Sequence, residues 1–191
     1  MAEKVLFLDI DGVLQPFTQY RHDHILNGDM ETVYEELQQR IGIDYRKYDI
    51  YDVAAVYYDW DKTAVAELKR VLDTTGAKIV LSSSWSDEDN TRMRDLFRIY
   101  ELHEYFIDRT MVEDYSRDFA PYLKYLKLPE DMKYQSHSME ILFYLSGHPE
   151  IKQYVVVDDM SMRGLGDHFV ETRRMLTPEL ADECIRVLET V

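Results

Sequence analysis

The stretch that decides the fold is residues 5–14, VLFLDIDGVL, in which a short apolar run leads directly into Asp9 and Asp11. A continuous apolar run indicates a strand that is buried on both faces, as in a parallel sheet, although periodicity alone also allows a segment of buried helix. Gly12 follows the aspartates and allows the backbone to turn sharply. This stretch therefore predicts a buried strand that ends in two carboxylates.

Two later apolar runs also end in polar residues. The strand expected at 78–81 continues into serines at 82–84. The strand expected at 154–157 continues into Asp158 and Asp159. Right-handed crossovers place the C-terminal ends of parallel strands along one edge, and ligands bind outside that edge. We therefore expect these polar groups to meet the two aspartates of the first strand in one site.

Helical patterns alternate with these strands. Val65, Leu68 and Leu72 recur at helical spacing, and Gly76 stands where a helix C-cap belongs. We expect helices over 30–40, 62–75, 87–100 and 136–147 and from Thr177 onward, with weaker strands at 105–107 and 168–170. Alternating strands and helices are typical of an α/β protein with a doubly wound parallel sheet.

The segment at 15–60 differs from the rest of the chain. It is rich in tyrosine and in charged residues and has few long apolar runs. We therefore predict a core domain made of residues 1–14 and 61–191, with 15–60 as a cap-like insertion. The residues of this insertion that could contact a substrate are Arg21, His22, His24 and Arg46.

The charge balance restricts the class of partner. The 191 residues contain 22 Lys and Arg against 37 Asp and Glu, a formal net charge of −15. Binding to a nucleic-acid backbone or to an anionic membrane draws on a basic surface, so this balance disfavours both partners. One cysteine, Cys184, excludes an internal disulfide and fits a reducing compartment. With no apolar run as long as a membrane span and no signal-peptide pattern at the start, a soluble, cytoplasmic protein is expected.

The four aspartates at the strand ends need a cation if they share one cleft. At an effective dielectric constant of about 20, two unit charges about 4 Å apart repel by about 4 kcal/mol. Oxygen ligands favour a hard cation, and Mg²⁺ held by carboxylates together with a substrate phosphate fits best. His and Cys are absent from the three strand-end clusters, which disfavours Zn²⁺. With Mg²⁺ and a phosphate, one aspartate can attack phosphorus while a second exchanges protons with the leaving oxygen and with water.

Each strand-end cluster also has a purely structural interpretation. A single aspartate after a strand is common in turns, and a serine before a helix is a common N-cap. The functional interpretation is favoured because three such clusters stand at matching strand ends of one chain.

These residues resemble the motifs of the haloacid dehalogenase-like (HAD) phosphohydrolases. The stretch VLFLDIDGVL is similar to their first motif, IVLSSSW at 79–85 to their second and VVVDD at 155–159 to their fourth. The second motif, with its tryptophan, also resembles that of the HAD domains of bacterial RNA-repair proteins. The resemblance implies a Rossmann-like α/β core, an Mg²⁺ cofactor and the hydrolysis of phosphoric monoesters.

The resemblance also implies roles for the four aspartates. Asp9 would be the nucleophile and an Mg²⁺ ligand. Asp11 would be the general acid and base, with its backbone carbonyl on the metal. Asp158 and Asp159 would hold the metal, and Asp159 is the expected direct ligand.

The phosphate-binding residues match the family less fully. Ser83 is the expected phosphate-binding hydroxyl, and Ser82 is the alternative because strand ends shift by a residue or two. The third motif of the family supplies a Lys or Arg near the start of a helix, where this chain has His137. Three alternatives remain for this cation. His137 could supply it as a protonated ring, although a helix N-terminus disfavours that charge. Lys133 could reach in from the preceding loop, or His137 could be a surface histidine without a role.

The leading hypothesis is an Mg²⁺-dependent phosphatase that acts on a small phosphorylated molecule. The first alternative is a binding or regulatory protein of the same fold with weak or no catalysis, because the third-motif cation is not evident. The second is a phosphatase of polynucleotide ends, which the net charge of −15 disfavours. We expect a monomer or a homodimer.

Overall fold

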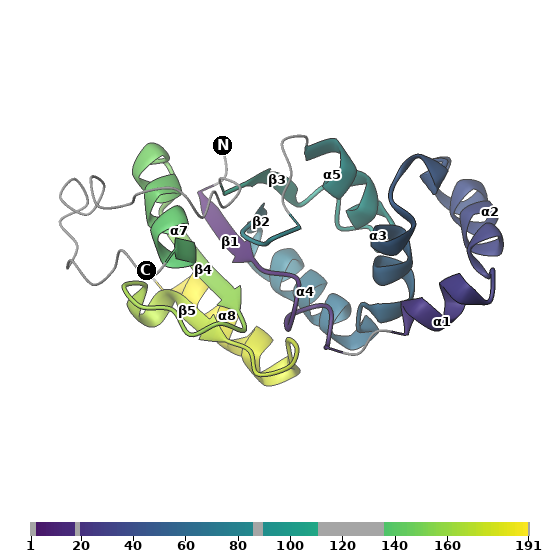
Figure 1. Ribbon diagram of the computed structural model, residues 1–191. Helices are drawn as coiled ribbons and strands as arrows, with labels where there is room; N and C mark the ends of the chain where they lie inside the picture. The colour runs from purple at the N-terminus through teal and green to yellow at the C-terminus, as the bar shows by residue number, and fades with distance from the viewer. Residues whose placement is uncertain (1–2, 18–19, 86–89, 111–135, 191) are drawn as a thin grey trace.

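The computed structural model describes residues 3–17, 20–85, 90–110 and 136–190. Five parallel strands form one sheet in the order β3-β2-β1-β4-β5 (Figure 1). Their bounds are Lys4–Leu8 for β1, Lys78–Leu81 for β2, Phe106–Arg109 for β3, Gln153–Asp158 for β4 and Phe169–Glu171 for β5. The predicted α/β fold with a doubly wound parallel sheet is therefore confirmed.

Strand β1 is the centre of the sheet. Its last four residues are fully buried, which agrees with the apolar run that predicted it. Leu8, the last residue of β1, is paired with Leu81 of β2 on one side and with Val157 of β4 on the other. Because these three positions are in register, the residues that directly follow them lie at the same edge of the sheet.

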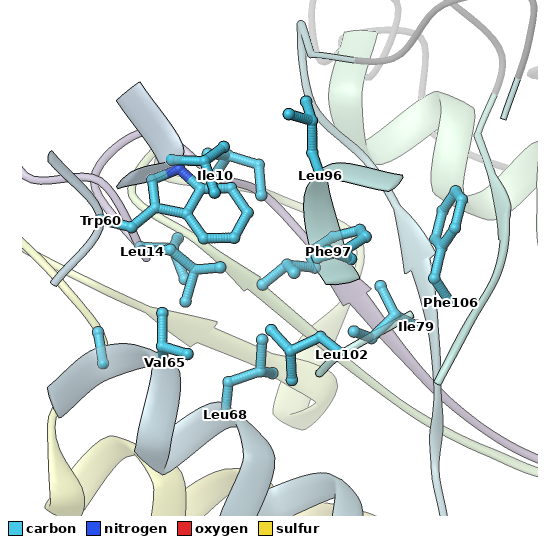
Figure 2. Close-up of a cluster of buried hydrophobic side chains, with 14 of the residues drawn as sticks. Ile10, Leu14, Trp60, Val65, Leu68, Ile79, Leu96, Phe97, Leu102 and Phe106 are labelled. Atoms are coloured by element: carbon cyan, nitrogen blue, oxygen red, sulfur yellow. The ribbon is translucent and has the colours of Figure 1, made fainter. Parts of the chain in front are cut away.

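Helices cover both faces of the sheet. They are α4 (Lys62–Thr75), α5 (Asn90–Arg98), α7 (Ser136–Gly147) and α8 (Pro178–Glu189). Leu6 and Leu8 belong to the larger apolar cluster, which includes side chains of α4, α5 and α8 and is drawn in part in Figure 2. Val5 and Phe7 belong to a smaller cluster that includes Ile141 of α7. Successive residues of β1 therefore face opposite layers, as the pleat of a strand requires.

Side-chain caps start two of the helices that flank the sheet, α4 and α8. The Asp61 carboxylate accepts hydrogen bonds from the backbone N–H groups of Thr63 and Ala64 at 2.8 and 2.9 Å, which starts α4. Gly76 ends the helix with a φ of 71°. Thr177 caps α8 in the same way as Asp61 caps α4. These are the starts and the stop that the sequence predicts.

The described residues of the insertion at 15–60 fold into a series of short helices, at the right in Figure 1. They are α1 (Arg21–Leu26), α2 (Met30–Ile41), the 3₁₀ turn η1 (Tyr45–Lys47), α3 (Ile50–Ala54) and the π-helical turn η2 (Ala55–Asp59). Only α2 is long enough for its periodicity to show in the sequence, which is why the others were missed. Tyr45, which is fully buried, donates its hydroxyl to the carbonyl oxygen of Asp95 in α5 at 2.6 Å. The insertion thus shares one apolar core with the sheet, and its action as a cap stays a prediction.

The two weaker strands begin one residue later than predicted, at Phe106 and Phe169. Tyr105 still closes a turn, because its N–H donates to the carbonyl of Leu102 at 3.1 Å. His168 ends the 3₁₀ turn that precedes β5. Of the helices in the described ranges, none combines the length and the apolar character that a membrane crossing requires.

Candidate active site

Three carboxylates meet where β1 and β4 end. Asp9 follows β1, Asp158 is the last residue of β4 and Asp159 comes next. These three residues, which we call the acidic cluster, each offer one carboxylate oxygen within 4.8 Å of the others. Asp9 is only 7% exposed and Asp158 only 1%, so water solvates these two groups poorly. The structure thus brings together three of the four aspartates that the sequence singled out.

Burial and mutual repulsion disfavour the charged form of the acidic cluster. Burial, and then the charge of Asp158, raises the pKa of Asp9 to about 7, although a hydrogen bond with Ser83 acts in the opposite direction. Burial, and then the charges of Asp158 and Asp11, also raises the pKa of Asp159. A cation would relieve this repulsion. Carboxylate oxygens are the donors that Mg²⁺ prefers, so the acidic cluster fits the predicted metal.

The Asp11 carboxylate lies outside the acidic cluster and is held by two donors. The Gln15 side-chain amide donates to one of its oxygens at 2.8 Å, and the Trp85 indole N–H donates to the other at 3.1 Å. Gln15 reaches Asp11 because the loop closes on itself, with the Gly12 N–H donating to the Gln15 carbonyl at 2.7 Å. The sequence analysis missed both donors. No local pattern signals a contact such as that of Trp85 with Asp11, which spans 74 residues.

Gly12 is required by a close approach as well as by its turn. Its φ is 71°, and a Cβ atom at this position would lie 2.5–2.6 Å from the side chain of Asp159. The carbonyl oxygen of Gly12 accepts a hydrogen bond from the Thr172 hydroxyl at 2.7 Å. The loop after β1 is therefore fixed against the loops that follow β4 and β5. The Asp159 side chain fills the space where any residue other than glycine at position 12 would place its Cβ atom.

The two candidate serines have different surroundings. The Ser83 hydroxyl interacts with the Asp9 carboxyl group and lowers its pKa, against the effect of burial. Ser82 is 2% exposed, and its backbone N–H donates to the Leu8 carbonyl at 2.8 Å, which extends the pairing of β2 with β1. Its hydroxyl lies 3.5 Å from that of Thr110. Ser83 is therefore the serine that the structure brings to Asp9.

His137 lies beside the acidic cluster. It stands in the first described turn of α7, and its Nδ1 is 3.5 Å from a carboxylate oxygen of Asp158. Its charge, when present, lowers the pKa of Asp159. Of the two cation candidates from the sequence, Lys133 lies outside the described residues. His137 is the one that the structure brings to the acidic cluster.

The four candidate substrate contacts of the insertion are engaged within it. Arg21 forms an ion pair with Asp59, which is 3% exposed, at 2.6 Å. His24 lies 2.9 Å from the Asp29 carboxylate and stacks on the ring of Tyr58. The other contacts join Arg46 to Glu31 and Asp44, and the ring of His22 to that of Tyr51. These contacts hold the described part of the insertion together, and a part of these side chains in substrate binding stays a prediction.

Comparison with known proteins gives one match. A family model described as the HAD domain in Swiss Army Knife RNA repair proteins matches residues 5–179, a span that includes the insertion and every residue of the candidate site. No curated protein and no solved structure matches the chain.

Proposed function

Because the chain belongs to the family of HAD domains found in Swiss Army Knife RNA repair proteins, we propose that it is an Mg²⁺-dependent phosphatase that hydrolyses a small phosphorylated molecule. One observation carries this proposal. Asp9 stands at the end of the central strand, inside the acidic cluster, and the Ser83 hydroxyl acts on its carboxyl group. A nucleophilic carboxylate, a metal site and a donor for a phosphoryl oxygen thus occupy one edge of the sheet.

The first step forms an aspartyl-phosphate. One carboxylate oxygen of Asp9 attacks phosphorus, and the bond from phosphorus to the ester oxygen breaks. Asp11 donates a proton to the departing oxygen, which leaves as an alcohol. The Ser83 hydroxyl donates a hydrogen bond to a phosphoryl oxygen and so holds the group in line with the attacking atom.

The second step releases inorganic phosphate and restores the enzyme. Asp11, now ionised, takes a proton from a water molecule, which attacks phosphorus. The bond from phosphorus to Asp9 breaks, the carboxylate is regenerated, and Asp11 is protonated again. When bound, Mg²⁺ supplies positive charge that offsets both the phosphate and the carboxylates of the acidic cluster.

His137 is the residue we assign to the missing third-motif cation. Its Nδ1 lies 3.5 Å from the Asp158 carboxylate, so a protonated ring would add positive charge beside the phosphate site. We expect His137→Gln to weaken inhibition by inorganic phosphate, measured as a higher inhibition constant. An unchanged constant would leave His137 without a part in phosphate binding.

The hydrolysis of p-nitrophenyl phosphate tests the proposed function. We expect wild-type activity to require Mg²⁺ and Asp9→Asn to lower kcat by at least about 100-fold, the lower end of what a positioned catalytic group contributes. The matched control is Asp44→Asn, which removes the same charge from an exposed carboxylate that is paired with Arg46. Equal activity in wild type and Asp9→Asn would favour the alternative of a binding or regulatory protein that has kept the fold without catalysis.

A second candidate function is the removal of a phosphate from a polynucleotide end. The RNA-repair setting of the family favours it. Two exposed arginines, Arg173 and Arg174, follow β5 at the edge of the sheet where the acidic cluster lies. The net charge of −15 still opposes a long polyanion, so we place this function second.

The remaining features of the proposal concern location and assembly. A single cysteine, Cys184, is buried and carries a pKa raised by burial to about 12, so its thiol is protonated and unreactive at neutral pH. A cytoplasmic protein suits such a thiol, and we propose that location, with the protein acting as a monomer or homodimer and without a membrane partner.

A further inference from the structure

We infer that Trp85 is a positioning residue that holds the Asp11 carboxyl group for proton transfer, an inference that rests on the proposed function. The reason begins with the freedom of an aspartate side chain in a loop. A carboxyl group that must give a proton to one oxygen and later take one from water acts well only if its plane is fixed. Hydrogen-bond donors on both oxygens would fix it.

Two donors hold Asp11 from different parts of the chain. Gln15 comes from the same loop and donates at 2.8 Å, so it moves when the loop moves. Trp85 comes from the loop after β2 and donates its indole N–H at 3.1 Å. Only the donor from Trp85 ties Asp11 to a second strand of the sheet.

Trp85 is itself held at its ring and at its backbone. Its ring packs edge-on against that of Trp60, with ring centroids 6.2 Å apart, and Trp60 lies in the core beside Ile10 and Leu14 (Figure 2). The backbone carbonyl of Trp85 accepts a hydrogen bond from the Arg92 guanidinium at 2.8 Å. An anchored indole is a better constraint on Asp11 than a side chain free to rotate.

Arg92 also joins this arrangement to the insertion. Its guanidinium pairs with the carboxylate of Asp52, which lies in α3. A continuous set of contacts therefore runs from α3 of the insertion through Arg92 and Trp85 to Asp11. The position of the insertion and the orientation of the proton-transfer group are linked through Trp85.

The first test measures the contact without activity. In ¹H–¹⁵N NMR spectra we expect two indole N–H signals, with that of Trp85 shifted downfield by its carboxylate partner and identified by its loss in Trp85→Phe. The Trp60 indole, a buried group without a hydrogen-bond partner among the described residues, serves as the internal control. Asp11→Ala should shift the Trp85 signal upfield and leave that of Trp60 in place. A Trp85 signal that does not respond to Asp11→Ala would overturn the inference.

The second test measures proton transfer. Benzyl phosphate has a poor leaving group that needs an acid, whereas p-nitrophenyl phosphate has a good one that needs little help. Trp85→Phe keeps the aromatic ring but removes the donor, so we expect kcat/KM for benzyl phosphate to fall at least about tenfold more than that for p-nitrophenyl phosphate, a part of what acid catalysis contributes. Equal losses for the two esters would assign Trp85 a merely structural role.

A double variant separates action through Asp11 from other effects. If Trp85 acts through Asp11, adding Trp85→Phe to Asp11→Ala should cause no further loss of kcat/KM for benzyl phosphate. A further loss equal to that seen in the wild-type background would contradict the inference. If wild type hydrolyses neither ester, the proposed function is wrong and the catalytic part of this inference falls with it, while the NMR test still decides whether the indole holds Asp11.

Discussion

Burial makes the charged form of Asp9 unfavourable in the folded, metal-free protein. Its pKa rises from 3.8 to about 7 on folding, chiefly through burial. Between these two values the folded state binds a proton that the unfolded state has released. Stability contributed by the protonated group is therefore complete below the unfolded pKa and is lost as the pH rises toward 7.

Asp9→Asn should accordingly stabilise the metal-free protein at high pH and have little effect at low pH. In EDTA at pH 8, we expect the Tm to rise by a few degrees, since about 1 kcal/mol corresponds to about 2–4 °C in a chain of this size. At pH 4 the difference should vanish, because Asp9 is then protonated. Thermal unfolding followed by circular dichroism measures this, and a Tm difference that is the same at both pH values would contradict it.

A second single-residue prediction concerns the stability and the Mg²⁺ dependence of a variant at Gly12. Gly12→Ala forces the Asp159 side chain to move, because the new Cβ would lie 2.5–2.6 Å from it. We expect a loss of about 1–3 kcal/mol in stability and a clear rise in the Mg²⁺ concentration that gives half-maximal activity.

Gly42→Ala is the matched control for Gly12→Ala. Gly42 has a φ of 82° but no other atom within 4 Å of its added Cβ, so the substitution brings backbone strain without a clash. Its Mg²⁺ dependence should stay that of the wild type. A similar shift in both variants would mean that Gly12 matters only for its turn.

The site residues that could be predicted are those marked by a pattern in the neighbouring sequence. Asp9, Asp158 and Asp159 were found because each directly follows an apolar strand, and parallel strands deliver their ends to one edge. Gln15 and Trp85 were not found, because their hydrogen bonds to Asp11 arise from the closure of one loop and the placement of another. The close approach of Asp159 to Gly12 is likewise visible only in three dimensions.

Helices and strands could likewise be predicted where the neighbouring sequence determines them, and were missed where distant contacts do. Helix α4 was predicted over its full length, because a regular apolar spacing and a glycine stop lie within or next to the segment itself, whereas the Asp61 cap was not singled out. The short helices of the insertion were missed, because a helix of three to six residues shows too little periodicity and is held by packing against the core. Local propensity thus gave the sheet and its helices, and tertiary contacts built the insertion.

The Asp61 cap provides a prediction for an element. Asp61→Ala removes the acceptor for two backbone N–H groups at the start of α4, which should lower the free energy of unfolding by about 1 kcal/mol. Asp61→Ser keeps a capping oxygen and is the conservative control, with most of the stability retained. Urea unfolding measures both variants. Equal losses in the two would show that the cap does not set the stability of α4.

At the scale of the whole molecule, the net charge of −15 separates the two candidate substrates. A small phosphate ester needs only the metal and the site, whereas a polynucleotide must also approach an acidic surface. We therefore expect a nucleoside monophosphate to have a higher kcat/KM than an oligonucleotide that carries the same terminal phosphate. For the oligonucleotide, kcat/KM should depend weakly on salt.

The opposite result would identify a polynucleotide substrate. If the oligonucleotide is preferred and its kcat/KM falls steeply as salt is added, counterion release from phosphate contacts is at work. Arg173→Ala and Arg174→Ala would then be expected to reduce the salt dependence. If the two arginines do not contact phosphates, neither substitution should change the salt dependence of kcat/KM.

If Asp9 carries the phosphoryl group during turnover, the aspartyl-phosphate can be trapped on this residue. Acid quenching of the enzyme during turnover of a phosphate ester with Mg²⁺, followed by borohydride reduction, converts an aspartyl-phosphate into homoserine that peptide mass spectrometry can locate. We expect homoserine at position 9, and none when Mg²⁺ is removed or in Asp9→Asn. Turnover that leaves position 9 unmodified, or modification at another carboxylate, would contradict it.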